Sequence, residues 1–187
     1  MLDADALAEL VCPPQTLHTD RLVLEALGPQ HLEGTWLAVQ DPEGARLTGT
    51  HATFTRESVD RWLGRIGGEP DRADWAVVRA DTREHVGEAV LNDLDLPNAC
   101  MNFRIALLAD SLGHGYGTEA TRAVVEHGFS VLGLHRIELE VYAFNDRARR
   151  VYEKCGFVVE GHRRDALLWD GAWHDAVTMA ILSTDRR

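Results

Sequence analysis

Three glycines at alternate positions stand immediately before a helical pattern, and they constrain the fold more than any other stretch of the chain. They are Gly113, Gly115 and Gly117, within SLGHGYGTEATRAV at 111–124. Glycine loses more conformational entropy on folding than any other residue. At a helix start, glycines let the backbone approach a ligand, with unpaired N–H groups and the positive dipole end facing it. This arrangement favours an anion, most often a phosphate, although a plain loop of tight turns uses glycine too.

Two common phosphate-binding motifs do not fit this loop. A P-loop carries Gly-Lys-Ser/Thr after four intervening residues, and residues 113–118 contain no lysine. A dinucleotide fingerprint follows the first strand of a parallel sheet. Here three strand-like runs of antiparallel type precede the glycines, so this fingerprint is not expected either.

Hydrophobic periodicity predicts strands and helices on both sides of the glycine loop. Strands are expected over 21–27, 73–80, 84–93, 98–108 and 135–144, with a final hairpin turning at Asp170–Gly171. Helices are expected over 28–40, 55–66, 118–132 and 145–157. The order predicts a single-domain α/β fold, with a mixed, mostly antiparallel sheet and a central parallel strand–helix–strand unit. Residues 1–18 are expected to form an N-terminal arm and residues 19–183 the domain.

The composition of the chain excludes several classes of binding partner. The net charge of −11 argues against nucleic acid, which needs a basic surface, and mildly favours a cationic partner such as an amine. No apolar run approaches the roughly 20 residues that span a bilayer, so no membrane partner is expected. The acidic start lacks the basic region of a signal peptide, which favours a cytoplasmic location. The three cysteines lack metal-type spacing, so no metal is expected.

The glycine loop and a segment some thirty residues later together resemble the acyl-coenzyme A (CoA) signature of the GNAT N-acetyltransferases. These segments are LGHGYGTEA at 112–120 and NDRARRVYEKCGF at 145–157. Within that superfamily the chain is similar to the RimJ/RimL branch of ribosomal-protein N-terminal acetyltransferases. The stretches that carry this second resemblance lie at 19–27, 132–161 and 170–182. Overall the resemblance covers about residues 18–182 and implies a GNAT-like fold.

The resemblance implies how acetyl-CoA, the co-substrate, would bind. The backbone of the loop would hold its pyrophosphate, through Gly113, His114, Gly115, Tyr116, Gly117 and Thr118. Leu112 stands where the family usually has Gln or Arg, a mild departure because the cradle is built from backbone. Leu107 and Leu108 would pair with the pantetheine amides through their main chains. Asn145 would hydrogen-bond the same arm, and it is also a plausible helix N-cap.

The resemblance also implies the catalytic residues. Tyr152, seven residues after Asn145 on the same helix face, would protonate the departing thiolate; a packed aromatic is the alternative. Asn102 stands where many members carry a glutamate. An amide is no base, but it can hold a water or orient the amine. Asp93, Asp95 and His174 are the candidate replacements, and each also fits a structural or solvated role.

These residues predict transfer of an acetyl group from acetyl-CoA to a primary amine by direct attack on the thioester. Near pH 7, deprotonating a lysine amine costs about 4–5 kcal/mol, whereas an α-amine costs about 1–1.5 kcal/mol. Without a strong base, an α-amine of a protein N-terminus or a small molecule is the easier acceptor. A non-catalytic acyl-CoA-binding sensor is the alternative, and a homodimer is compatible with either interpretation.

Overall fold

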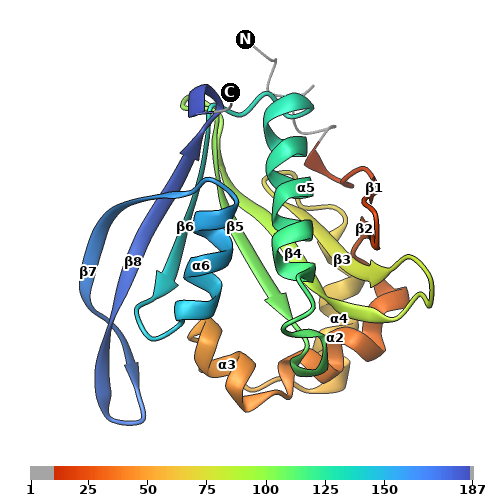
Figure 1. Cartoon of the computed structure of the whole chain (residues 1–187). Coiled ribbons are helices and arrows are strands. Elements are labelled where there is room, and N and C mark those ends of the chain that lie inside the picture. The colour runs from red at the N-terminus through yellow and green to blue at the C-terminus, as the bar shows by residue number, and fades with distance from the viewer. Residues whose placement is uncertain (1–10, 186–187) are drawn as a thin grey trace.

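An eight-stranded sheet forms the centre of the computed structural model, which describes residues 11–185. The strand order is β1-β2-β3-β4-β5-β6-β8-β7, and among these described strands only β5 and β6 pair in parallel (Figure 1). The strands are β1 Leu17–His18, β2 Leu22–Ala26, β3 Ala73–Arg79, β4 His85–Asp95, β5 Cys100–Leu107, β6 Arg136–Tyr142, β7 Val158–Trp169 and β8 Ala172–Leu182. The predicted mixed, mostly antiparallel sheet with one parallel strand–helix–strand unit is confirmed.

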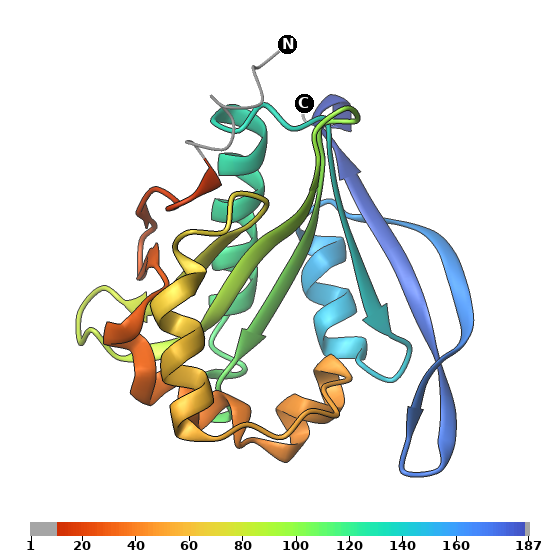
Figure 2. The same ribbon diagram turned by 180° about the vertical axis from the view of Figure 1, so that it is seen from behind.

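Helices cover both faces of this sheet. The helix α5 (Tyr116–Ser130) and the helix α6 (Asp146–Lys154) lie on one face (Figure 1). On the other face lie α2 (Leu32–Val39) and α4 (Arg56–Ile66), as the reverse view shows (Figure 2). Short 3-10 turns occupy Pro29–His31, Ala109–Ser111 and Ser183–Asp185. None of the helices within residues 11–185 is long and apolar enough to cross a membrane.

One helix, α3 (Pro42–Thr48), was not predicted from the sequence. Asp41 caps it by accepting a hydrogen bond from the Glu43 backbone N–H at 3.0 Å, and Pro42 fills its first turn. The helix buries no residue completely, so it lacks the apolar periodicity that identifies longer helices. It packs against β5 and β6 at the end of the sheet where the glycine loop lies.

Part of the predicted N-terminal arm lies outside the described residues. Within the described part, the Val11 side chain is fully buried and belongs to the main core. Leu17 pairs with Leu24 across β1 and β2. The boundary between an arm and a domain near residue 18 stays a prediction.

The strands β5 and β6 separate soon after they meet. Their pairing covers only Cys100 with Arg136, Met101 with Ile137 and Asn102 with Glu138. Beyond Asn102 they diverge (Figure 1), while β5 stays paired with β4 as far as Leu107. The second half of β5 therefore has one edge without a neighbouring strand, and this gap positions the site.

Candidate active site

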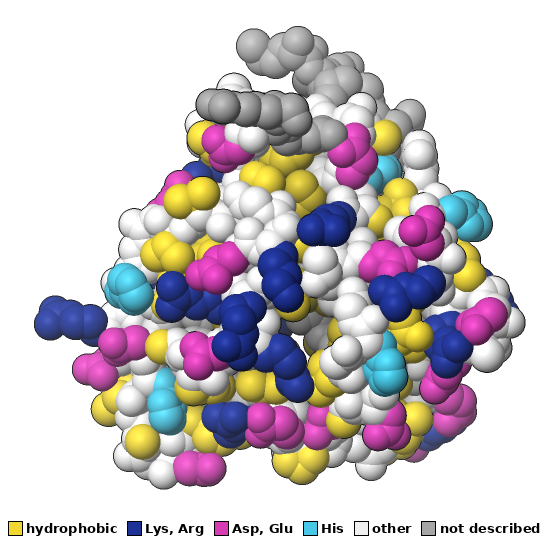
Figure 3. Space-filling view, in the orientation of Figure 1, with side chains coloured by type: hydrophobic (Ala, Val, Ile, Leu, Met, Phe, Trp, Pro, Cys, Tyr) yellow, Lys and Arg dark blue, Asp and Glu magenta, His cyan; other side chains and the backbone are white. Residues whose placement is uncertain are grey.

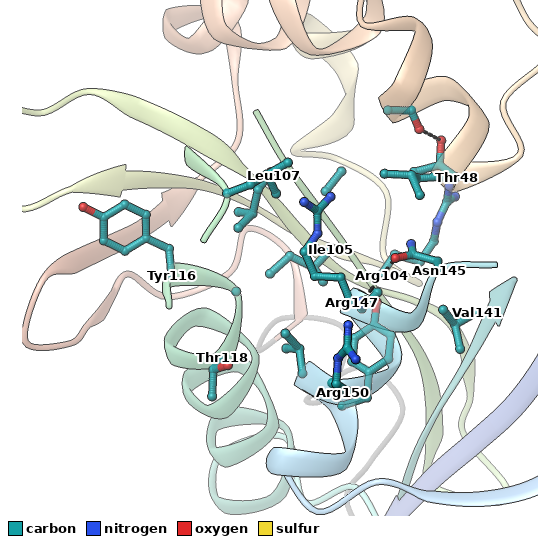
Figure 4. Close-up of a pocket in the computed structure, with 18 of the residues that line it drawn as sticks. Thr48, Arg104, Ile105, Leu107, Tyr116, Thr118, Val141, Asn145, Arg147 and Arg150 are labelled. Atoms are coloured by element: carbon teal, nitrogen blue, oxygen red, sulfur yellow. Dashed lines mark hydrogen bonds between the residues drawn. The ribbon is translucent and has the colours of Figure 1, made fainter. Parts of the chain in front are cut away.

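A cavity of about 590 Å³ occupies the gap between β5 and β6. It is bounded by α3 on one side and by the glycine loop, α5 and α6 on the other (Figure 4). Its lining includes all but two of the predicted site residues: Asn102, Leu107, Gly113, Gly115, Tyr116, Gly117, Thr118, Asn145 and Tyr152. The two that do not line it are Leu108 and His114. Segments that are distant in the sequence thus converge on one cavity.

The glycine loop presents a row of unpaired backbone donors. Among the described residues, no group accepts a hydrogen bond from the backbone N–H of any residue from 113 to 118. Gly113 and Gly115 have φ of +83° and +84°, in the left-handed region that glycine adopts without strain. A Cβ at Gly113 would meet nothing within 4 Å, and one at Gly115 only the end of the Arg21 side chain at 3.3 Å. Open space and free N–H groups at a helix start fit a pyrophosphate.

An ion pair from the start of the chain fixes the orientation of this loop. Arg21 donates from Nε to Glu119 Oε2 at 2.8 Å and from Nη1 to the His114 carbonyl at 2.9 Å. Thr19 donates to Glu119 Oε1 at 2.6 Å. Burial raises the pKa of Glu119, but the hydrogen bonds from Thr19 and Arg21 outweigh it and hold this pKa below its usual value. The His114 carbonyl is thereby tied to Arg21, and neither residue lines the cavity.

We expect Glu119→Gln to weaken CoA binding by about twofold to fivefold without changing kcat, because ion pairs of this exposure contribute up to about 1 kcal/mol. Titration calorimetry with CoA measures the effect. Arg56→Gln is the matched control, since Arg56 pairs with Glu33 away from the cavity. Equal CoA affinities for both variants and the wild type would show that the loop keeps its shape unaided.

The backbone N–H and carbonyl of Leu107 face the cavity, whereas those of Leu108 do not. The Leu108 N–H donates to the Val86 carbonyl at 2.9 Å, and its carbonyl accepts from the Ser111 N–H at 2.9 Å. Ladder hydrogen bonds alternate along a strand, so Leu107 directs its N–H and carbonyl away from β4, towards the gap. The expectation that both leucines pair with a ligand is therefore corrected to Leu107, because both Leu108 groups are engaged within the chain.

Two residues of α6 face the cavity from its other wall. Asn145 caps the helix, accepting from the Ala148 N–H at 3.1 Å, and its amide nitrogen has no partner within the described residues. Tyr152 is 6% exposed and packs edge-on against Phe103, with ring centroids 6.3 Å apart. Burial raises the pKa of Tyr152 to about 12. Its hydroxyl, unpaired among residues 11–185, therefore stays protonated and can donate.

Asn102, the last residue of β5 that pairs with β6, lines the cavity. Its Nδ2 donates to Asn92 Oδ1 at 3.0 Å, and Asn92 Nδ2 donates to Asp93 Oδ2 at 2.7 Å. The Asn102 Oδ1 has no donor among the described residues, so it is free to accept a hydrogen bond from an amine or a water.

The three candidate bases do not reach this cavity. Asp93 is engaged with Asn92, and Asp95 accepts from the Asn98 side chain at 2.8 Å. His174 packs edge-on against Phe144, with ring centroids 5.0 Å apart. None of the three lines the cavity, so the structure gives the missing glutamate no replacement among them.

The acetyltransferase (GNAT) domain model matches residues 21–158, which span the gap, the glycine loop and most of the cavity lining. The chain belongs to the GNAT acetyltransferase family. It is similar to the uncharacterized N-acetyltransferase YoaA of Bacillus subtilis, with 27% identity over 89% of this chain and 96% of that protein. Its identity to the spermidine N(1)-acetyltransferase of Vibrio cholerae is 29%, over 61% of this chain and 66% of that one.

A solved structure of a spermidine N-acetyltransferase from Vibrio cholerae, in complex with CoA and spermine, shares the fold. The TM-score is 0.83, with 22% identity over 89% of this chain and 98% of that chain. GNAT enzymes use acetyl-CoA, and the free N–H row and open space of the glycine loop fit that co-substrate. The described residues contain no group of three side chains able to hold a metal ion.

This GNAT acetyltransferase concentrates positive charge around its cavity despite its acidic composition. Lys and Arg side chains gather near the centre of the face that carries α5 and α6 (Figure 3). Arg147, Arg150 and Lys154 line the cavity from α6, whereas Arg149 pairs with Glu153 outside it. A cationic rim beside the glycine loop suits the phosphates of CoA.

The sequence analysis missed other residues of the cavity wall, chiefly Arg104 on β5, Glu140 on β6 and Thr48 on α3. Strand alternation was the available signal for the first two. It places Arg104 on the face of Asn102, and Glu140 on the face opposite the buried Leu139. For Thr48 there was no signal, because α3 itself was not predicted.

Proposed function

We propose that this GNAT acetyltransferase transfers an acetyl group from acetyl-CoA directly to a primary amine with a low pKa. The acceptor is an α-amine, on a protein N-terminus or a small molecule. The observation that carries the proposal is that the cavity passes through the sheet. Thr118 and Val151 line it on the side of α5 and α6, and Thr48 and Glu140 on the side of α3. A donor and an acceptor can therefore approach one point from opposite faces.

Each role in this reaction falls to a residue of the cavity. Acetyl-CoA supplies an activated thioester, held by the N–H groups of residues 113–118 and by the Leu107 main chain. Asn102 Oδ1 accepts a hydrogen bond from the amine and orients its lone pair. Tyr152 Oη donates a hydrogen bond to the sulfur and keeps its proton as the C–N bond forms and the C–S bond breaks. The sulfur takes the bonding electron pair, and the amine loses one proton to water.

The charges of the cavity explain why a low-pKa amine is the better acceptor. Glu43 is paired with Arg46 and Glu140 with Arg163, so neither carboxylate is a free base. Asp41 is occupied as the cap of α3. With no base to accept the proton among the described residues that line the cavity, the reaction depends on the fraction of amine that is already neutral.

We expect kcat/KM for the amine to rise with pH and to level off at the pKa of the amine itself. An α-amine and a lysine-type amine of similar size, each assayed with acetyl-CoA, should give two profiles displaced by the difference of their pKa values. An inflection well below both amine pKa values would reveal an enzyme base and contradict the assignment of Asn102.

The variant Asn102→Glu tests directly whether a base at this position changes which amine is acetylated. A carboxylate at this position should help the lysine-type amine most, because that amine carries the larger deprotonation cost of about 4–5 kcal/mol. If the variant slows every acceptor, Asn102 places the amine or a water and the position matters without being a base. CoA binding without turnover of any amine would favour the sensor alternative. The RimJ/RimL subtype and the homodimer stay predictions of the sequence.

A further inference from the structure

Arg104 is an uncompensated cation in the wall of the cavity. It lies in the exposed half of β5 and lines the cavity (Figure 4). Within residues 11–185 its guanidinium makes no hydrogen bond and no ion pair. By contrast, Arg46 and Arg163 are neutralised by two carboxylates of the cavity lining, Glu43 and Glu140 respectively. A guanidinium has five donors in a fork that matches a carboxylate, and here all of them are available.

The strand geometry places Arg104 on the acceptor side of the cavity. Side chains alternate along β5, so Arg104 shares a face with Asn102, while Phe103 between them is buried on the face of α6. Arg104 and Glu140 each lie two residues beyond the last paired positions, Asn102 and Glu138, and both line the gap between the strands. Glu140 does not neutralise it, because that carboxylate is paired with Arg163.

The phosphates of the donor have other partners. Arg147, Arg150 and Lys154 line the cavity from α6, the helix that packs on the Phe103 face of β5, whereas Arg104 belongs to the other face of that strand. An anion that reaches Arg104 therefore belongs to the acceptor. The carboxylates that line this side within residues 11–185 are all engaged, Glu43 with Arg46, Glu140 with Arg163 and Asp41 as the cap of α3, so none of them neutralises Arg104.

Building on the proposed function, we propose that Arg104 binds a carboxylate that the acceptor carries a short distance from its amine. Two sources share this carboxylate: a peptide whose N-terminal residues are acidic, and a free amino acid, whose α-amine has a higher pKa than a peptide N-terminus and is therefore compared at equal concentrations of neutral amine. A polyamine does not fit this site, because it has no carboxylate and would bring a further positive charge close to the guanidinium of Arg104. Arg104 is thus a specificity-determining residue that contacts the acceptor and takes no part in proton transfer.

The test compares acceptors that differ in one carboxylate. The peptide arm uses Ser-Asp and Ser-Asn, both with amidated C-termini, so that the α-amines have similar pKa values. The amino-acid arm uses serine and serinamide, compared at equal concentrations of neutral amine. We expect wild-type kcat/KM to favour the carboxylate in one arm by about 10- to 100-fold, the range for hydrogen bonds to charged groups. The arm that shows the preference identifies the source.

Arg104→Gln should remove this preference, and Arg104→Lys should keep part of it, because lysine retains the charge and loses the fork. Arg147→Gln is the matched control: it should raise KM for acetyl-CoA and leave the acceptor preference intact. If the wild type acetylates amines without preferring the carboxylate, or if the preference survives Arg104→Gln, this inference is overturned while the proposed function stands. An Arg104→Gln variant that only raises KM for acetyl-CoA overturns it too. Failure of the wild type to acetylate any amine contradicts the proposed function as well.

Discussion

Gly115→Val is expected to reduce CoA affinity by at least about 100-fold in a protein that still folds. Gly115 has φ of +84°, and a β-branched residue in this region is strained. Relieving the strain requires the peptides of the loop to turn, which changes where the free N–H groups of residues 113–118 point. Losing two hydrogen bonds to a charged group accounts for a change of this size. Titration calorimetry with CoA, with circular dichroism to confirm folding, measures it.

Gly171→Val separates the effect of the loop from the effect of the strain. Gly171 lies in the turn between β7 and β8, with φ of +78°, and a Cβ at this position would meet nothing within 4 Å. The same substitution there should lower Tm through a comparable backbone cost, about 1–3 kcal/mol, and leave CoA affinity unchanged. If a folded Gly115→Val protein bound CoA with wild-type affinity, the glycine loop would not be part of the CoA-binding site.

The elements that could be predicted from the sequence are those whose hydrophobic or glycine pattern lies in neighbouring residues. Ile137, Leu139 and Val141 alternate with polar residues in the sequence, and in the structure all three are buried along β6. The glycines that precede the helical hydrophobic pattern likewise predicted the start of α5 to within two residues of its observed position at Tyr116. Each signal lies in neighbouring residues, so no knowledge of the rest of the chain was required.

The parts that could not be predicted depend on contacts between distant segments. Arg21 and Glu119 are 98 positions apart, and nothing local to either residue indicates their ion pair. Residues 103–107 of β5 have the pattern of an ordinary strand, and only the pairing with β6 shows that one edge is open. Leu108 was misassigned for the same reason, because its partner Val86 belongs to another strand.

Tyr152→Phe is expected to lower kcat by about 100-fold or more, the usual loss when a catalytic proton donor is removed, with little change in KM for acetyl-CoA. Phenylalanine fills the same space beside Phe103, and the lost hydroxyl had no partner among the described residues. The substitution should therefore leave Tm close to the wild-type value. Steady-state kinetics and a thermal melt on the same preparations test both statements.

The pKa of Tyr152 also fixes how this donor works. Burial raises that pKa to about 12, whereas an ordinary thiol has a pKa of about 8.5. Complete transfer of the phenolic proton to a free thiolate is thus unfavourable, and we propose that the hydroxyl acts chiefly by hydrogen-bonding the sulfur while negative charge develops there. Because the phenol stays protonated below about pH 12, ionisation of Tyr152 should cause no fall of kcat between about pH 7 and 10. A Tyr152→Phe variant with wild-type kcat across this range would reduce Tyr152 to a packing residue and mean that the sulfur leaves without help from α6.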